Sequence, residues 1–207
     1  MLIKKFVVGP LQENCYIVVD EKTKHAIVID PGDEGDRIND AIKDGGLTIT
    51  AIICTHAHFD HVGAAGEIKA ATGAKILIHK EDLETYNMAK EHASFWGFDV
   101  ADLPDPDGFL SEGDDVKAGS LNFKVIHVPG HSPGGICLYG EGVLMVGDTI
   151  FQGSVGRTDF PGGSHERLKD SFRRLLELPD DTKVYAGHGN ETTIGREKRD
   201  NFFVNEL

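Results

Sequence analysis

Residues 55–61 of this 207-residue chain read Thr-His-Ala-His-Phe-Asp-His and concentrate side chains that bind metal ions. The donors in this segment are His56, His58, Asp60 and His61. A packed core does not need imidazoles and a carboxylate at this density, whereas nitrogen and oxygen donors so close together suit a divalent metal. The alternative, a solvated polar loop with incidental histidines, explains the segment less well. The motif therefore predicts a metal centre.

The neighbouring sequence predicts where this motif lies in the fold. Residues 51–54 form a short apolar run typical of a buried strand, and residues 62–71 read as a helix that ends near Gly73. The motif would then occupy the turn between a strand and a helix. Ligand sites in open α/β sheets lie beyond the carboxyl ends of strands.

Three later apolar runs, over residues 123–128, 143–146 and 184–186, are each followed by a glycine and then a histidine or aspartate. Glycine allows sharp turns and close backbone approach. The three residues that follow are His131, Asp148 and His188. Each alone reads equally well as a turn residue. The repetition, together with the first motif, predicts one shared site of seven donors.

Composition excludes several classes of protein. The length predicts a single domain over residues 1–207 with a sizeable core. The formal net charge of −13 argues against a nucleic-acid partner. The densest basic segments, residues 173–174 and 196–199, read as solvated helix faces. No secretory leader and no apolar run of about 20 residues is apparent, so we expect no membrane partner.

The chain has three cysteines, Cys15, Cys54 and Cys137, all within apolar runs and without a Cys-x-x-Cys motif. An odd number in such settings predicts buried reduced thiols and a cytoplasmic protein, not a disulfide framework. None lies on a turn where a nucleophile would be expected.

The remaining pattern predicts an α/β protein with two halves of mixed sheet and helices outside. Strands, a helix, a strand and a helix are followed by strands, a helix and a strand, which would make a four-layer αββα sandwich. Further predicted strands cover residues 2–8, 15–19, 26–29, 75–78 and 116–128, with a hairpin over 136–146. Further predicted helices cover residues 37–43, 81–91 and 164–178, the last capped by Ser164.

Residues 94–108 form an aromatic, proline-broken segment that predicts a long loop. Long loops in compact domains are often functional, so Phe95, Trp96 and Phe98 are candidates for a substrate-pocket wall. The alternative, that these rings cover the edge of the core, explains the segment equally well.

The motifs resemble those of the metallo-β-lactamase superfamily, whose metal motifs follow the same order along the chain. This resemblance implies the αββα fold. Residues 128–135, 147–151 and 156–161 look most like the glyoxalase II (hydroxyacylglutathione hydrolase) group, in its short bacterial form. The chain has Asp148 where true β-lactamases usually carry cysteine, and His58 where flavin-partnered diiron reductases carry glutamate. The glutathione-holding residues of the longer glyoxalase II proteins find no counterpart, so the physiological thiol stays open.

The resemblance also implies how the donors divide. One metal would take His56, His58 and His131, a second would take Asp60, His61 and His188, and Asp148 would bridge them. Asp60 and Asp148 are the carboxylates expected to be catalytic. Zinc, as one or two ions, is the expected metal, and iron or manganese also suits nitrogen and oxygen ligands.

The implied reaction is hydrolysis of a small-molecule thioester, S-lactoylglutathione or a related compound. A metal lowers the pKa of bound water from about 15.7 to about 7, so that a hydroxide is available at neutral pH. A thiol has a pKa of about 8.5 and leaves without a strong acid. Arg157, in the segment Gly-Arg-Thr-Asp-Phe, could contact substrate or pair with Asp159 to fix the loop.

Two other enzymes fit the motifs. A persulfide dioxygenase would use one iron held by His56, His131 and Asp148. A lactonase would use the same hydrolytic centre. A non-catalytic metal-binding module would be expected to lack ligands, and none is missing. The sequence does not give the oligomeric state.

Overall fold

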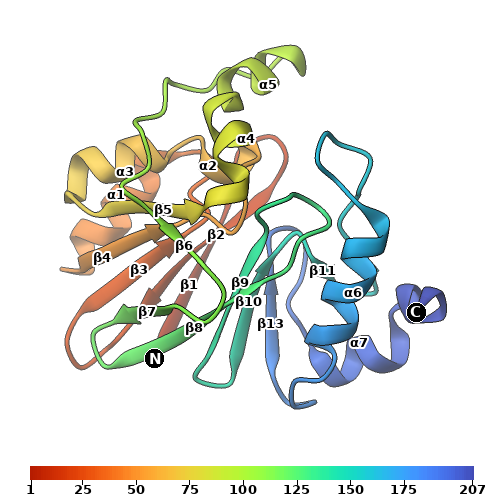
Figure 1. Cartoon of the computed structure of the whole chain (residues 1–207). Coiled ribbons are helices and arrows are strands. Elements are labelled where there is room, and N and C mark those ends of the chain that lie inside the picture. The colour runs from red at the N-terminus through yellow and green to blue at the C-terminus, as the bar shows by residue number, and fades with distance from the viewer.

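Two six-stranded sheets face each other in the structure, a computed structural model that describes residues 1–207 (Figure 1). The first sheet contains β1 Leu2–Val8, β2 Glu13–Val19, β3 His25–Ile29, β4 Thr48–Ile53, β5 Lys75–His79 and β6 Gly108–Leu110, in that order. The second sheet has the order β14-β13-β10-β9-β8-β7, with β7 Asp115–Ala118, β8 Leu121–His127, β9 Ile136–Gly140, β10 Val143–Gly147, β13 Lys183–Ala186 and β14 Thr192–Thr193. A short hairpin pairs β11 Ile150–Phe151 with β12 Ser154–Val155.

Helices cover the outer side of each sheet. Figure 1 shows α1 and α3 beyond the first sheet and α6 and α7 beyond the second. The helices are α1 Gly35–Asp44, α2 Phe59–Val62, α3 Ala65–Thr72, α4 Leu83–Asn87, α5 Ala89–Phe95, α6 His165–Leu175 and α7 Ile194–Asp200, with the 3-10 turns η1 Lys80–Asp82 and η2 Phe202–Glu206. None of these helices is both long and apolar enough to cross a membrane.

Three hydrophobic clusters fill the spaces between the layers. Along β2, Ile17 and Val19 pack toward α1 and α3, whereas Tyr16 and Val18 pack between the two sheets. Successive side chains on a strand point to opposite faces, so a strand covered on both faces is apolar throughout. A third cluster packs the second sheet against α6 and α7. Three clusters separate four layers, and the predicted αββα sandwich is confirmed.

The predicted helix over residues 81–91 is wrong in its continuity, because the segment is divided into η1, α4 and α5. The breaks fall at Asp82 and Met88, whose backbones leave the helical region. The predicted helix over residues 62–71 is likewise divided into α2 and α3. The N–H of Ala64 donates to the carbonyl of Pro31 at 2.9 Å, which takes it out of the helical ladder.

The C-terminal half differs from the prediction in two places. Helix α6 begins at Ser164 as predicted, where the Ser164 hydroxyl accepts from the N–H of Arg167 at 3.3 Å, but it ends at Leu175. The basic segment 196–199 lies on α7, yet Glu197 within it is fully buried. Its carboxylate accepts from the Thr192 hydroxyl at 2.6 Å, so this helix face is not simply solvated.

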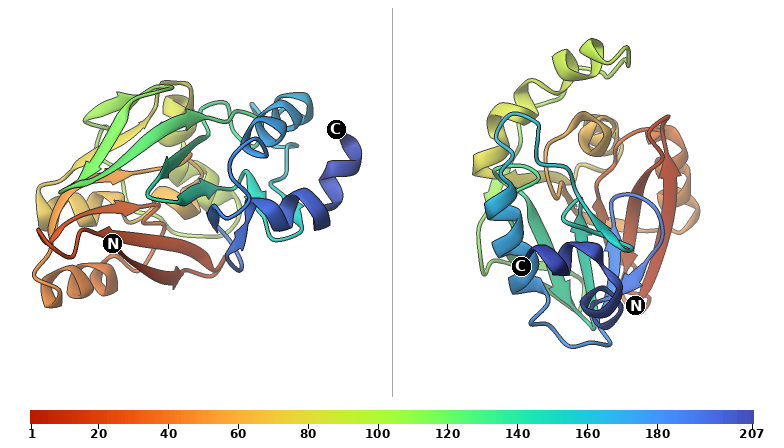
Figure 2. Two further views of the ribbon diagram at one scale, coloured as in Figure 1. Left: turned by 90° about the horizontal axis from the view of Figure 1, so that it is seen from below. Right: turned by 90° about the vertical axis from the view of Figure 1, so that its right-hand side faces the viewer.

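Strand direction determines where the loops meet. Strands β3, β4, β5 and β6 are parallel to one another, and β10 is parallel to β13. Their carboxyl ends therefore lie at one end of the sandwich. Helix α5 and the loop after it extend beyond the body of the sandwich at this end (Figures 1 and 2).

Candidate metal centre

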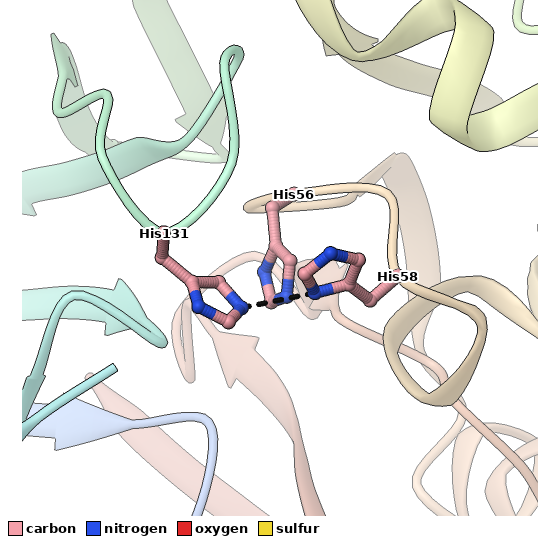
Figure 3. Close-up of side chains that lie close together, drawn as sticks. All are labelled: His56, His58 and His131. Atoms are coloured by element: carbon pink, nitrogen blue, oxygen red, sulfur yellow. Dashed lines mark hydrogen bonds between the residues drawn. The ribbon is translucent and has the colours of Figure 1, made fainter. Parts of the chain in front are cut away.

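Three imidazoles meet where the loop after β4 approaches the loop after β8. His56 and His58 come from the first loop and His131 from the second (Figure 3). Nε2 of His131 lies 2.9 Å from Nδ1 of His58, and the ring of His56 is 4.8 Å from that of His131. One ligand atom from each residue lies within 4.8 Å of the others. This spacing allows one ion to contact all three.

A second group of donors lies beside the first. Asp60 and His61 occupy the first turn of α2, and His188 follows β13. Oδ2 of Asp60 is 3.3 Å from Nε2 of His188 and 3.7 Å from Nε2 of His61. These three residues also place one ligand atom each within 4.8 Å of the others.

Asp148, directly after β10, faces both groups. Its Oδ1 lies 3.5 Å from Nε2 of His61, and its Oδ2 lies 3.7 Å from Nε2 of His131 and 3.6 Å from Nε2 of His188. The structure thus brings together all seven donors that the sequence singles out. Asp148 is the carboxylate that connects the two groups.

The donor set fits a cation. Nε2 of His56, Nε2 of His61 and Oδ1 of Asp148 are buried and have no hydrogen-bond partner within the protein. Buried polar atoms are almost always paired, so three orphaned atoms that face one another indicate a ligand between them. Burial lowers the pKa of His58 to about 3, which keeps its imidazole neutral and able to coordinate a metal.

In two histidines of the centre, His131 and His61, the protein holds the ring nitrogen that faces away from the other donors. Nδ1 of His131 donates to the carbonyl of Arg157 at 2.7 Å, which directs Nε2 toward the centre. Nδ1 of His61 lies 3.2 Å from Oδ2 of Asp30. Such partners fix the tautomer and ring orientation of a metal ligand.

Asp30 and Glu13 are parts of the site that the sequence prediction missed. Asp30, at the end of β3, also accepts from the backbone N–H and the hydroxyl of Thr55, both at 2.6 Å. Its position after a strand was the signal that could have found it. Oε1 of Glu13 lies 3.7 Å from Nδ1 of His61, and burial raises the pKa of Glu13 well above its usual value. Glu13 gives no such signal, because it lies within an apolar strand.

Asp82 connects two of the loops that carry the ligands. Its buried carboxylate accepts from the N–H of Ala57 at 3.0 Å, the hydroxyl of Ser132 at 2.9 Å and the N–H of Gly134. Ala57 lies between His56 and His58, and Ser132 follows His131. One carboxylate therefore fastens both sides of the first group of imidazoles.

The glycine before His188 is required by close packing. A Cβ atom on Gly187 would lie 2.3 Å from Oδ1 of Asp148 and 2.6 Å from Cε1 of His61. A Cβ on Gly147 would lie 2.2 Å from the Thr55 hydroxyl, and Gly147 has a φ of +51°. The repeated glycine of the sequence pattern thus reflects how tightly the loops meet.

The structure places the candidate substrate residues around this centre. Arg157 and Asp159 form a bidentate pair at 2.6 Å, and the guanidinium lies 4.0 Å above the Phe160 ring. Phe160 in turn lies edge-on to His58, with ring centres 5.4 Å apart. Trp96 is 6.4 Å from Phe160.

The other two aromatic candidates, Phe98 and Phe95, differ in their surroundings. Phe98 lies 5.5 Å from Phe59, beside the second group of donors, whereas Phe95 is 81 % exposed.

The three cysteines are buried and unpaired, and burial raises the pKa of each thiol. His79 and His127 stack on each other at 4.0 Å and are not members of either triad.

The sequence profile of the metallo-β-lactamase superfamily matches residues 8–188. The chain belongs to this superfamily. Its members include a protein of Haemophilus influenzae named hydroxyacylglutathione hydrolase GloC, which is 40 % identical over 99 % of both chains.

Solved structures of superfamily members resemble the chain closely. The BLEG-1 B3 metallo-β-lactamase has a TM-score of 0.91 at 34 % identity, covering 98 % of this chain and 99 % of its own. TTHA1623, in a di-iron-bound form, has a TM-score of 0.90 at 41 % identity, covering 97 % of this chain and 99 % of its own. ETHE1 from Myxococcus xanthus has a TM-score of 0.83 at 30 % identity, covering 100 % of this chain and 85 % of its own. Within this superfamily fold, the chain places seven histidine and aspartate side chains that could hold metal ions in one site.

Proposed function

We propose that this superfamily member is a metal-dependent thioester hydrolase of the glyoxalase II type. The observation that carries the proposal is the position of Asp148, whose two oxygens face both triads of donors at 3.5–3.7 Å. A carboxylate placed in this way suits a pair of metal ions. The similarity of the chain to GloC supports a thioester as the bond that is cleaved.

In this proposal His56, His58 and His131 hold one ion, and Asp60, His61 and His188 hold the other. The bound metal would supply Lewis-acid polarisation of a carbonyl and would lower the pKa of water. The chain's own contribution is to orient these donors. Asp30 holds His61 by its outer nitrogen, and the carbonyl of Arg157 holds His131.

The donor set contains no spare acid, and this determines which kind of leaving group we propose. In this proposal every histidine of the centre is a metal ligand, so none is left to protonate a poor leaving group. A thiolate departs without such help, because its parent thiol has a pKa of about 8.5. We therefore propose a small-molecule thioester, such as S-lactoylglutathione or a related compound, as substrate.

Zinc is the proposed metal, with one ion in each of the two positions. Iron and manganese suit the same nitrogen and oxygen donors, and the di-iron form of TTHA1623 makes iron a specific alternative. A persulfide dioxygenase with one iron on His56, His131 and Asp148 is accordingly the second candidate function.

Freshly purified protein tests these candidates. Its metal content should be measured together with thioester hydrolysis and with oxygen uptake in the presence of a persulfide. Thioester hydrolysis that is lost on chelation and restored by added metal supports the hydrolase. Oxygen uptake without thioester hydrolysis would overturn it in favour of the dioxygenase.

A further inference from the structure

A cavity of about 270 Å³ opens beside Asp60, and Arg157 is not among the residues that line it. Asp60 belongs both to the cavity wall and to the second triad of donors. A group bound in the cavity would therefore lie next to the thioester bond that the proposed enzyme cleaves. His131 and Phe160 do not line the cavity.

Apolar residues from three separate segments line part of the cavity. The turn between β1 and β2 contributes Val8, Pro10 and Leu11. Helix α2 contributes Phe59, and the loop after α5 contributes Phe98 and Val100. The rings of Phe59 and Phe98 lie 5.5 Å apart at 30° to each other. Apolar surface left open to water in this way favours an apolar ligand.

The turn between β1 and β2 is held in place without a ligand. The N–H of Gly9 donates to the Glu34 carboxylate at 3.2 Å, and Arg37 donates to the carbonyl of Val7 at 3.0 Å. Glu34 and Arg37 also pair with each other at 2.7 Å. One wall of the cavity is thus preformed, as is usual for small-molecule sites.

The charged residues that line the cavity, Asp33, Asp60 and Asp99, are all acidic, and no lysine or arginine lines it. Since the proposed metal would offset the charge of Asp60, Asp33 and Asp99 are the two that would keep their full charge. A ligand group that carries a carboxylate would meet like charge there, and like charges in apposition disfavour binding. The cavity therefore does not suit the anionic glutathionyl part of a substrate.

We propose that this cavity binds the acyl group of the thioester and selects acyl groups that are apolar and uncharged. This inference rests on the proposed thioesterase function. At about 270 Å³ the cavity lies near the lower end of the range of small-molecule pockets, about 300–1,000 Å³. A straight acyl chain of medium length fills a cavity of this size, whereas a lactoyl group leaves most of it empty.

The test uses acyl thioesters of N-acetylcysteamine, an uncharged thiol, so that only the acyl group varies. Hydrolysis by the metal-loaded enzyme should be measured for acetyl, butyryl, hexanoyl, octanoyl and succinyl thioesters. We expect kcat/KM to rise between about twofold and fourfold per added methylene up to the octanoyl chain. Succinyl should fall at least tenfold below butyryl, which has the same chain length.

Variants locate the effect in this cavity. Phe98→Ala should reduce the octanoyl-to-acetyl ratio at least fivefold, and Val100→Trp should shift the preference to shorter chains by filling the space. Asp99→Asn should narrow the gap between succinyl and butyryl. Phe202→Ala is the matched control, since it removes the same type of ring from η2, where Phe202 is exposed and does not line the cavity. Its chain-length profile should match that of the wild type.

The outcomes separate this inference from the function on which it rests. Hydrolysis of all five thioesters at similar rates, or a profile that Phe98→Ala and Val100→Trp both leave unchanged, would overturn the acyl site and leave the thioesterase intact. Failure to hydrolyse any thioester, together with oxygen uptake from a persulfide, would overturn the proposed function and the acyl site with it.

Discussion

The carboxylate of Asp82 accepts a hydrogen bond from the backbone N–H of Ala57 at 3.0 Å, midway between His56 and His58. The same carboxylate binds Ser132 and Gly134, which follow His131. Asp82 is not one of the proposed metal ligands. It nevertheless sets the distance between the two loops whose histidines would bind the same metal ion.

Asp82→Asn should weaken metal binding by about 10- to 100-fold, the usual cost of losing a partner that orients the ligands. An amide has only one acceptor oxygen and would turn its N–H groups toward at least one of the three donors. Competition with a chromophoric chelator measures the affinity. Asp105→Asn is the control, because Asp105 is exposed and forms no side-chain hydrogen bond or ion pair. Unchanged affinity in a folded Asp82→Asn protein would refute the positioning role.

Asp148→Ala should abolish hydrolysis and lower metal content in both positions. Its carboxylate faces both triads, so neither ion would keep a complete set of ligands. Metal analysis and steady-state rates on the same preparation provide the measurement. A variant that retains wild-type stoichiometry and rate would show that Asp148 does not bridge.

Asp60→Ala and His188→Ala should each empty only the second position. Neither residue belongs to the His56, His58 and His131 group, so that ion should stay bound. We expect a protein with about one equivalent of metal and a large loss of rate. Full activity with one metal would instead identify a mononuclear enzyme and favour the dioxygenase.

Trp96→Ala should raise KM with little change in kcat, the signature of a lost contact made equally in the ground and transition states. Trp96 is 54 % exposed and lies 6.4 Å from Phe160, near the first group of imidazoles. Because so much of the ring is exposed, the melting temperature should change little. A lower melting temperature with unchanged KM would show that Trp96 covers the core instead.

Chelation should lower the melting temperature, because a ligand that binds only the folded state stabilises it. At a free metal concentration of about 1,000 times Kd, the contribution to the free energy of unfolding is about 4 kcal/mol. Differential scanning calorimetry with and without EDTA measures the shift. Identical melts for the metal-loaded and chelated protein would contradict tight binding by the folded centre.

Local patterns in the sequence predict the seven donors, and the resemblance of their motifs to a known superfamily implies the fold, with which the strand and helix pattern agrees. A buried strand is apolar throughout, and a glycine before His131, Asp148 or His188 marks a strand end where the chain turns sharply. The four-layer sandwich and the superfamily are confirmed. The thioester, the metal and the substrate residues stay proposals.

What could not be predicted depends on contacts between distant segments. Asp82 meets Ala57 and Gly134, which are 25 and 52 residues away along the chain. From its position it reads as an ordinary residue of a helix over 81–91, yet its buried hydrogen bonds coincide with the break in that helix. Glu197 is similar, since it reads as a surface charge but is buried against Thr192 and Gly153.

One measurement tests the central proposal most directly, namely thioester hydrolysis and persulfide-dependent oxygen uptake by one metal-analysed preparation. The proposal predicts about two equivalents of metal, hydrolysis that chelation abolishes and metal restores, and no oxygen uptake. One equivalent of iron, with oxygen consumed in proportion to persulfide and no thioester cleaved, would contradict it.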